Sequence, residues 1–173
     1  MPEQFRVEEN KENIIPVNYT VDNLSDLPNT FMVKPGEDIY ISAQKAYKIW
    51  KTNSLLLSTS PDLSGGEVSS QAVWQEDSYE VVEDIEVIGS GENAIIHVKT
   101  KTDKEGNAVI ALKIGETIRW SWQLWVSDYN PLSKENGTTY DFNGLTFMDR
   151  NLGATGNPKA GGDRTFGLYY QWG

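Results

Sequence analysis

The clearest pattern of apolar and polar positions lies in Thr117–Val126, where the two kinds of residue alternate. Successive side chains of a β-strand point to opposite faces, so this pattern predicts a strand with one apolar face. The predicted apolar face consists of Ile118, Trp120, Trp122, Leu124 and Val126. The other face carries Arg119, Ser121, Gln123 and Ser127, with Trp125 as an exception. Two tryptophans on one face require a thick apolar layer, most simply a second sheet about 10 Å away.

Shorter apolar runs precede this strand, separated by Gly, Pro, Asn and Ser, as is typical of an antiparallel β-sandwich. Strands are predicted at residues 19–27, Thr30–Val33, Asp38–Ser42, residues 71–75, within residues 81–88, at residues 94–100 and at residues 107–113. In residues 71–75, Ala72 and Trp74 are expected on one face. We interpret the last two strands, which are joined by a charged loop, as a β-hairpin. Residues 43–51 suit either a helical turn or a bent strand, and no helix of normal length is evident.

The character of the chain changes after Pro131. Residues 139–148 form two short apolar runs around Asn143-Gly144, the strongest short-range signal for a β-hairpin. Residues 149–166 are rich in glycine and loop-like, and residues 167–173 are aromatic and end abruptly. We therefore expect three parts: an extended arm at residues 1–18, an all-β antiparallel sandwich at residues 19–127, and a partial, truncated β/loop module at residues 128–173.

Composition and charge narrow the functional classes. The net charge of -10 argues against nucleic acid or an anionic membrane as a partner, because both attract a basic surface. No cysteine is present, which excludes disulfides and thiolate chemistry within this chain. Residues 1–16 have no apolar core of a signal peptide, and no apolar run reaches a transmembrane length. Either the protein is used without export, or the sequence is a mature or trimmed form.

The first 13 residues show no consistent period. They are either a disordered terminus or a tether that becomes ordered on a larger assembly. The apolar anchors of such a tether would be Phe5, Val7, Ile14 and Ile15.

Candidate catalytic and metal-binding residues are few. His97 is the only histidine and lies on the expected outward face of its strand, so we interpret it as a surface residue. No Gly-x-Ser-x-Gly turn is present for a serine nucleophile. The acidic run at residues 76–92 suits either a solvated face or a calcium site, and we favour the solvated face. We expect no catalytic residue, metal or cofactor.

A set of aromatic residues near the C-terminus has two interpretations. They either stack on sugar rings or pack between the sandwich and the following module, and we favour packing. These residues are Trp125, Tyr169, Tyr170 and Trp172.

Three motifs resemble a family of bacterial proteins. They are the tryptophan-rich segment at residues 118–131, the segment at residues 140–154 with Asp149-Arg150-Asn151-Leu152-Gly153, and Gly167-Leu168-Tyr169-Tyr170-Gln171-Trp172-Gly173. Together they resemble the start of the Fibrobacter succinogenes major paralogous domain in Bacteroidetes surface and fimbria-associated proteins. The upstream part resembles the immunoglobulin-like region that precedes that domain. The family has no established catalytic residues, and its members usually carry an export signal and continue well past the last motif.

The resemblance implies a non-enzymatic structural or adhesive module on an extracellular assembly, in contact with other protein subunits. Two settings remain open, a bacterial surface or fimbrial protein and a phage head or tail decoration. The alternative function is a carbohydrate-binding or carbohydrate-processing domain that contacts surface glycans. The expected location is the cell surface or the virion surface, without insertion into a membrane.

Overall fold

The computed structural model describes residues 27–59, 63, 66–76, 80–131, 139–157, 159 and 161–169. Apart from Leu27, the strand predicted at residues 19–27 lies outside these residues. The same is true of Tyr170 and Trp172 and of the four apolar anchors of the arm, Phe5, Val7, Ile14 and Ile15.

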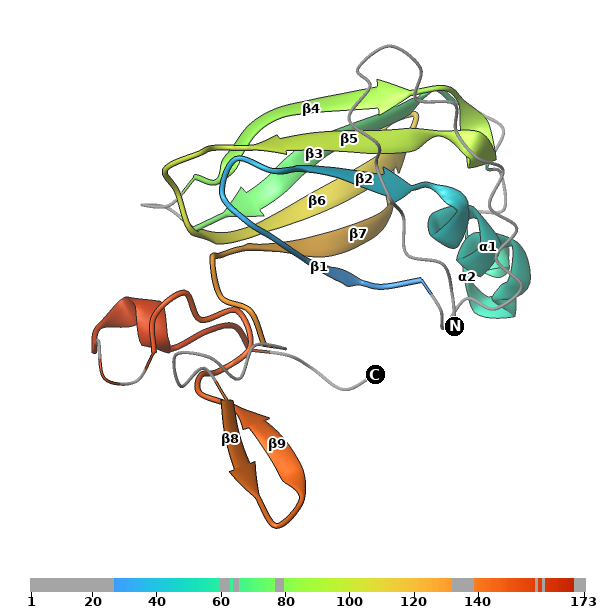
Figure 1. The fold of residues 1–173 in the computed structure, drawn as a ribbon. Helices are drawn as coiled ribbons and strands as arrows, with labels where there is room; N and C mark the ends of the chain where they lie inside the picture. Colours follow the sequence, from blue (N-terminus) through green and yellow to red (C-terminus); the bar gives the residue numbers. More distant parts are fainter. Residues whose placement is uncertain are drawn as a thin grey trace.

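The predicted all-β sandwich is confirmed (Figure 1). One sheet has the order β1-β7-β6-β3, and the second has the order β2-β5-β4. The first sheet contains β1 Thr30–Val33, β7 Thr117–Val126, β6 Gly106–Ile114 and β3 Val68–Gln75. The second contains β2 Asp38–Ser42, β5 Ile95–Thr100 and β4 Val82–Ile88. All pairings within them are antiparallel except that of β1 with β7.

The strand order is that of an immunoglobulin fold. Strands β2, β5 and β4 follow the order of strands B, E and D, and β3, β6 and β7 follow that of C, F and G. The core lies between the two sheets, and Trp122 is its largest fully buried side chain at 2% exposure. The first sheet contributes Leu124 and Ile110 to this core, and the second sheet contributes Ile41, Ile96 and Val98. Ile96 and Val98 are buried, whereas His97 between them is not, as expected for a residue on the outward face of this strand.

The alternation of β7 holds only in its second half. Trp122, Leu124 and Val126 are buried, but Ile118 is 48% exposed and Trp120 only partly buried. A register shift at Leu112/Lys113 of β6 explains the difference, because Leu112 pairs with Trp120 whereas Lys113 pairs with Ile118. The bulge leaves Arg119 buried at 7% exposure, with its guanidinium 4.6 Å from the ring centre of Trp50. The prediction of one continuous apolar face is thus wrong at the start of the strand.

The predicted hairpin of residues 94–100 and 107–113 is wrong. Strand β5 pairs with β2 and β4, whereas β6 pairs with β3 and β7 in the other sheet. The connection between them crosses from one sheet to the other. The hairpin partner of β6 is β7, across a turn at Gly115, whose φ of +58° suits glycine.

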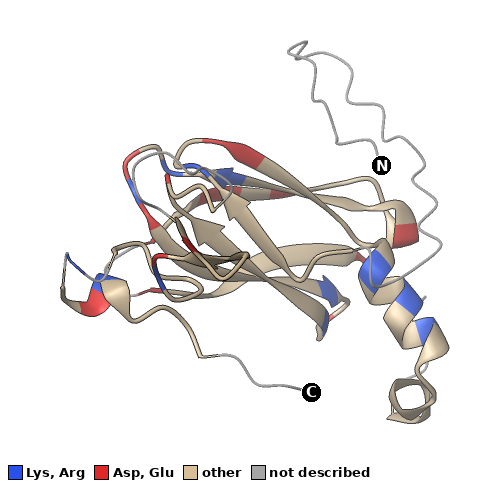
Figure 2. Ribbon diagram, turned by 60° about the horizontal axis from the view of Figure 1, so that its bottom comes forward, with Lys and Arg blue, Asp and Glu red and all other residues tan. Residues whose placement is uncertain are grey.

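Of the two alternatives for residues 43–51, the structure has the helix, α1 Gln44–Thr52, and a second helix that was not predicted follows it, α2 Ser54–Thr59. They lie at one end of the sandwich (Figure 1). Ala46 and Tyr47 are the buried apolar residues of α1, and the lysines of this helix are marked in Figure 2. Asn53 separates the helices, and its Oδ1 accepts hydrogen bonds from the backbone N–H groups of Leu55 and Leu56. This capping starts α2 directly after α1.

The hairpin predicted around Asn143-Gly144 is confirmed as β8 Thr139–Phe142 and β9 Leu145–Met148. Asn143 and Gly144 have φ angles of +51° and +78°, as a two-residue type I′ turn requires. Short 3-10 turns at Gly91–Asn93 and Asp163–Thr165 complete the described structure. The C-terminal segment, residues 139–157, 159 and 161–169, lies at the end of the sandwich opposite the helices (Figures 1 and 2).

Candidate functional site

Asn107 joins the C-terminal segment to the sandwich. This second residue of β6 is fully buried, and its amide uses both its nitrogen and its oxygen. Its Nδ2 donates to the carbonyl oxygen of Gly153 at 2.7 Å and to Oε2 of Glu76 at 3.3 Å. Its Oδ1 accepts from Nε2 of Gln123 at 3.0 Å. Buried amides are stable only when hydrogen-bonded, so Asn107 holds β3, β7 and the C-terminal segment in register with one another.

Gly153 is required at this contact by its backbone and by its neighbours. Its φ of +81° lies in the left-handed region. A Cβ atom here would approach Oδ1 of Asn107 to 3.2 Å and Cγ of Leu168 to 3.0 Å. A side chain would therefore separate the C-terminal segment from Asn107.

Glu105, in the loop before β6, is a second link. Its Oε1 accepts hydrogen bonds from Oγ of Ser127 and the backbone N–H of Asp128, both at 2.9 Å. Its Oε2 forms an ion pair with Arg164 of the C-terminal segment. One carboxylate thus connects the end of β7 to the turn at residues 163–165.

An aromatic contact completes this junction, which we define as Glu105, Asn107, Trp125, Tyr129, Asp149, Arg150, Gly153 and Arg164. Trp125 is 2% exposed, and its ring centre lies 5.8 Å from that of Tyr129. The guanidinium of Arg150 lies 4.0 Å from the Tyr129 ring centre, and its Nε donates to Asp149 at 2.7 Å. Burial, with the charge of Asp149, raises the pKa of Tyr129, which therefore stays neutral at physiological pH.

The structure shows where several residues that the sequence singled out lie. Trp125 is buried, so no ring face is free for a ligand, whereas Tyr169 is fully exposed. These two residues therefore do not form one aromatic platform. Asp149, Arg150 and Gly153 of the resemblance motif serve as contacts between the two parts of the chain. No local pattern in the sequence points to Glu105 or Asn107, because their partners lie far away along the chain.

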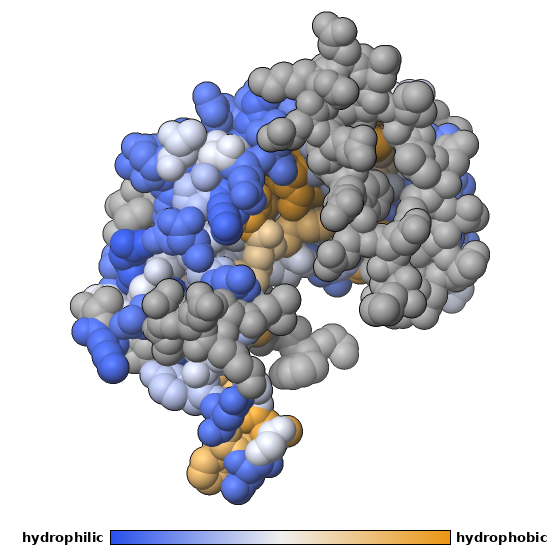
Figure 3. Space-filling model, in the orientation of Figure 1, coloured by the Kyte–Doolittle hydropathy of each residue, from blue (hydrophilic) through white to orange (hydrophobic). Residues whose placement is uncertain are grey.

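The hairpin β8–β9 presents an apolar face to solvent. In its register Tyr140 pairs with Phe147 and Phe142 with Leu145, so the four side chains share one face. Their exposures are 55%, 49%, 67% and 62% in that order. Figure 3 shows apolar side chains of this hairpin at the surface. We call these four residues the hairpin face.

His97 lies on the outer face of the second sheet, between its neighbours on β2 and β4. Its Nε2 is 2.8 Å from Asp38, its Nδ1 is 3.8 Å from Glu86, and its ring stacks on Tyr40 at 4.5 Å. Burial, with the nearby Asp38, raises the pKa of Tyr40. The group is a cross-strand cluster of charged and aromatic residues, which stabilises a sheet face. Among the described residues, no three His, Cys, Asp or Glu side chains are placed to hold a metal ion.

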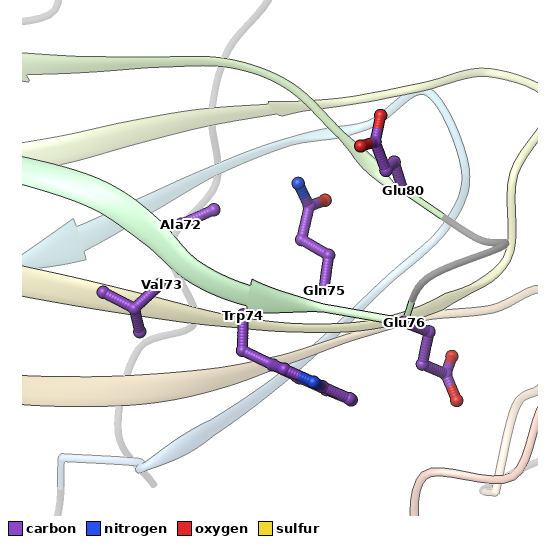
Figure 4. Close-up of a pocket in the computed structure, with 6 residues that line it drawn as sticks. All are labelled: Ala72, Val73, Trp74, Gln75, Glu76 and Glu80. Atoms are coloured by element: carbon purple, nitrogen blue, oxygen red, sulfur yellow. The ribbon is translucent and has the colours of Figure 1, made fainter.

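Strand β3, the last strand in its sheet, has a groove of about 260 Å³ along it (Figure 4). We call it the edge groove; it is lined by Ala72, Val73, Trp74, Gln75, Glu76 and Glu80. A register shift between Ala72 and Trp74 pairs Ala72 with Ile110 and Trp74 with Val109. Ala72 packs against the core and Trp74 is 42% exposed, so the prediction that they share a face is wrong. The alternation in residues 71–75 gave no sign of this bulge.

The acidic residues of the run at 76–92 that the structure describes are dispersed over the edge groove, β4 and the turn at Gly91–Asn93. Glu80 lies 3.4 Å from Lys101, Asp84 lies 3.7 Å from Lys99, and Glu92 pairs with Lys51 of α1. Figure 2 shows the acidic residues spread along the ribbon. These ion pairs are solvent-exposed and contribute little to stability.

No helix among the described residues is long and apolar enough to cross a membrane. Comparisons of the chain with protein-family models, with curated proteins and with solved structures gave no match.

Proposed function

We propose that the protein is a non-enzymatic structural or adhesive module of an extracellular assembly, and that it contacts neighbouring protein subunits through the hairpin face. The observation that carries this proposal is the exposure of four large apolar side chains on one side of a two-stranded sheet. Burying a side chain of this size stabilises a protein by about 1.5–3 kcal/mol. A lone two-stranded hairpin is marginally stable in water, so such a face favours a partner.

The charge of the chain favours a different protein as that partner over a second copy. At a net charge of -10, two copies repel each other over most approaches. The junction supports a role in assembly, because Asn107 and Glu105 fix the C-terminal segment to the sandwich. The hairpin face is therefore presented from an anchored segment.

The resemblance to Bacteroidetes surface and fimbria-associated proteins supports an extracellular setting. The two settings, a bacterial surface or fimbrial protein and a virion decoration, both require docking to other subunits. The predicted arm, with Phe5, Val7, Ile14 and Ile15, is a second proposed attachment element and lies outside the described residues. The unprocessed gene product distinguishes the settings, since a removed export signal favours the first and a native Met1 favours the second.

Changing Phe142 and Phe147 to serine together is expected to abolish incorporation into the native assembly. Phe142 is 67% exposed and Phe147 49% exposed, so the loss of their apolar area weakens docking more than it weakens the fold. The melting temperature of the sandwich should change little, because neither residue belongs to its core. Incorporation is measured by the amount of variant recovered in purified fimbriae or virions.

The matched control is Leu55→Ser on α2, an apolar residue that is 71% exposed at the other end of the sandwich. This control should incorporate like the unchanged protein. Equal incorporation of the double variant and the control would contradict a docking role for the hairpin face.

A further inference from the structure

The edge groove lies on a surface separate from the hairpin face. Strand β3 is the outermost strand of its sheet, and Glu80 stands just before β4 of the other sheet. Figure 4 shows Trp74 and Glu76 pointing to one side of β3, with Gln75 on the other side. The groove is therefore lined by side chains from both sides of the strand. At about 260 Å³, the groove is smaller than the roughly 300–1,000 Å³ of sites that enclose drug-sized ligands, so it suits a ring or two of a longer molecule.

Trp74 supplies a flat apolar surface. The bulge places Val73 and Trp74 in succession with exposures of 41% and 42%. A tryptophan ring has an electron-rich face that attracts polarised C–H groups and cations. The apolar faces of pyranose rings present such C–H groups.

The polar side chains beside Trp74 are already held in place. Oε2 of Glu76 accepts a hydrogen bond from the backbone N–H of Asn107 at 2.8 Å, which leaves Oε1 for a ligand. Oε1 of Gln75 accepts from the backbone N–H groups of Val81 and Val82 at 3.1 and 3.0 Å. The Gln75 amide is therefore fixed, and its Nε2 can donate to a ligand oxygen. Preorganised donors and acceptors of this kind bind hydroxyl groups at a low entropic cost.

Three other classes of ligand fit this surface less well. An extended peptide that adds a strand needs a regular ladder, and the bulge at Val73 interrupts it. Anionic ligands are repelled by Glu76 and Glu80. A cationic ligand must compete with Lys101, which already lies 3.4 Å from Glu80. A neutral, polyhydroxylated ring uses both the indole face and the fixed polar groups.

From this geometry we infer that the edge groove binds a neutral saccharide, which stacks on Trp74 and hydrogen-bonds to Gln75 and Glu76. The inference goes beyond the proposed assembly role and uses none of the residues of the hairpin face. It gives the molecule a glycan-binding surface at the edge of its sandwich.

Isothermal titration calorimetry of the whole chain with cellohexaose, maltohexaose, mannohexaose and xylohexaose tests the inference. At least one of these neutral probes should bind, and Trp74→Ala should weaken that binding about tenfold or more, as loss of a stacked ring predicts. Trp74→Phe keeps an aromatic face and should retain most of the affinity. Tyr169→Ala, at another exposed aromatic residue, should leave it unchanged.

Oligogalacturonate and oligolysine are the charged comparison probes. The inference is overturned if no neutral probe binds, if Trp74→Ala binds as well as the unchanged chain, or if only a charged probe shows Trp74-dependent binding. The Phe142→Ser, Phe147→Ser variant should bind the neutral probe normally. This separates failure of the groove from failure of the proposed docking role.

Discussion

Replacing Trp122 with alanine is expected to lower the free energy of unfolding by about 3–5 kcal/mol. Its side chain is 2% exposed and lies between the two sheets, where a cavity of this size cannot be filled by small shifts. Trp120→Ala should cost clearly less, because the bulge at Arg119 of β7 leaves Trp120 only partly buried. Urea denaturation followed by circular dichroism measures both changes.

Ser121→Ala is the control, since Ser121 is exposed on the same strand and should change stability by no more than about 0.5 kcal/mol. Similar denaturation midpoints for the variants at Trp122 and Ser121 would show that β7 does not contribute its second half to the core. A larger loss at Trp120 than at Trp122 would contradict the position of the bulge.

Asn107→Asp is expected to release the C-terminal segment from the sandwich. The substitution keeps the shape of the side chain but removes the Nδ2 donor to Gly153, and it places a carboxylate beside Oε2 of Glu76. A buried polar group that loses its partner costs about 1–3 kcal/mol, and the like charge adds to that cost. Residues 149–169 should become sensitive to limited proteolysis while the sandwich resists it.

Gly153→Ala should produce the same early cleavage, because its Cβ atom would crowd Asn107 and Leu168. Asn93→Asp introduces the same change at an exposed asparagine and should leave the digestion pattern unchanged. If the C-terminal segment of the Asn107 variant is cut no faster than that of the Asn93 variant, the junction is not what holds it.

Local signals predicted the parts of the fold that depend on neighbouring residues. Alternation identified β7, and Asn143-Gly144 identified the hairpin β8–β9, because a type I′ turn fixes its own strand pairing. The pairing of β5 was not predictable in this way. Adjacent strands in a sandwich pair within one sheet or cross to the other, and the crossing depends on packing that local sequence does not encode.

The sequence left residues 43–51 open between a helical turn and a bent strand, because tertiary contacts define helix α1. Its buried residues, Lys45, Ala46 and Tyr47, are consecutive and give no helical period. Lys45 is 6% exposed and contacts the backbone oxygen of Leu27, and burial lowers its pKa. The burial of a lysine cannot be predicted from helix propensity, because lysine side chains are rarely buried.

The candidate surfaces were predicted in part. The sequence singled out the residues of the hairpin face as a hairpin, but it could not indicate that their shared face is uncovered. It treated Trp74 as an ordinary strand residue, because a bulge is set by the pairing with β6. Asn107 and Gly153 are 46 positions apart, so their contact required the fold.

Hydrogen exchange of the isolated chain tests the docking role of the hairpin face, because this role requires the face to be uncovered and its strands to gain stability from a partner. Backbone amides of β8 and β9 should exchange far faster than those of β6 and β7, which pair within the sandwich. Comparable protection of the hairpin and the sandwich in the isolated chain would rule out the proposed docking role, since the hairpin would then need no partner.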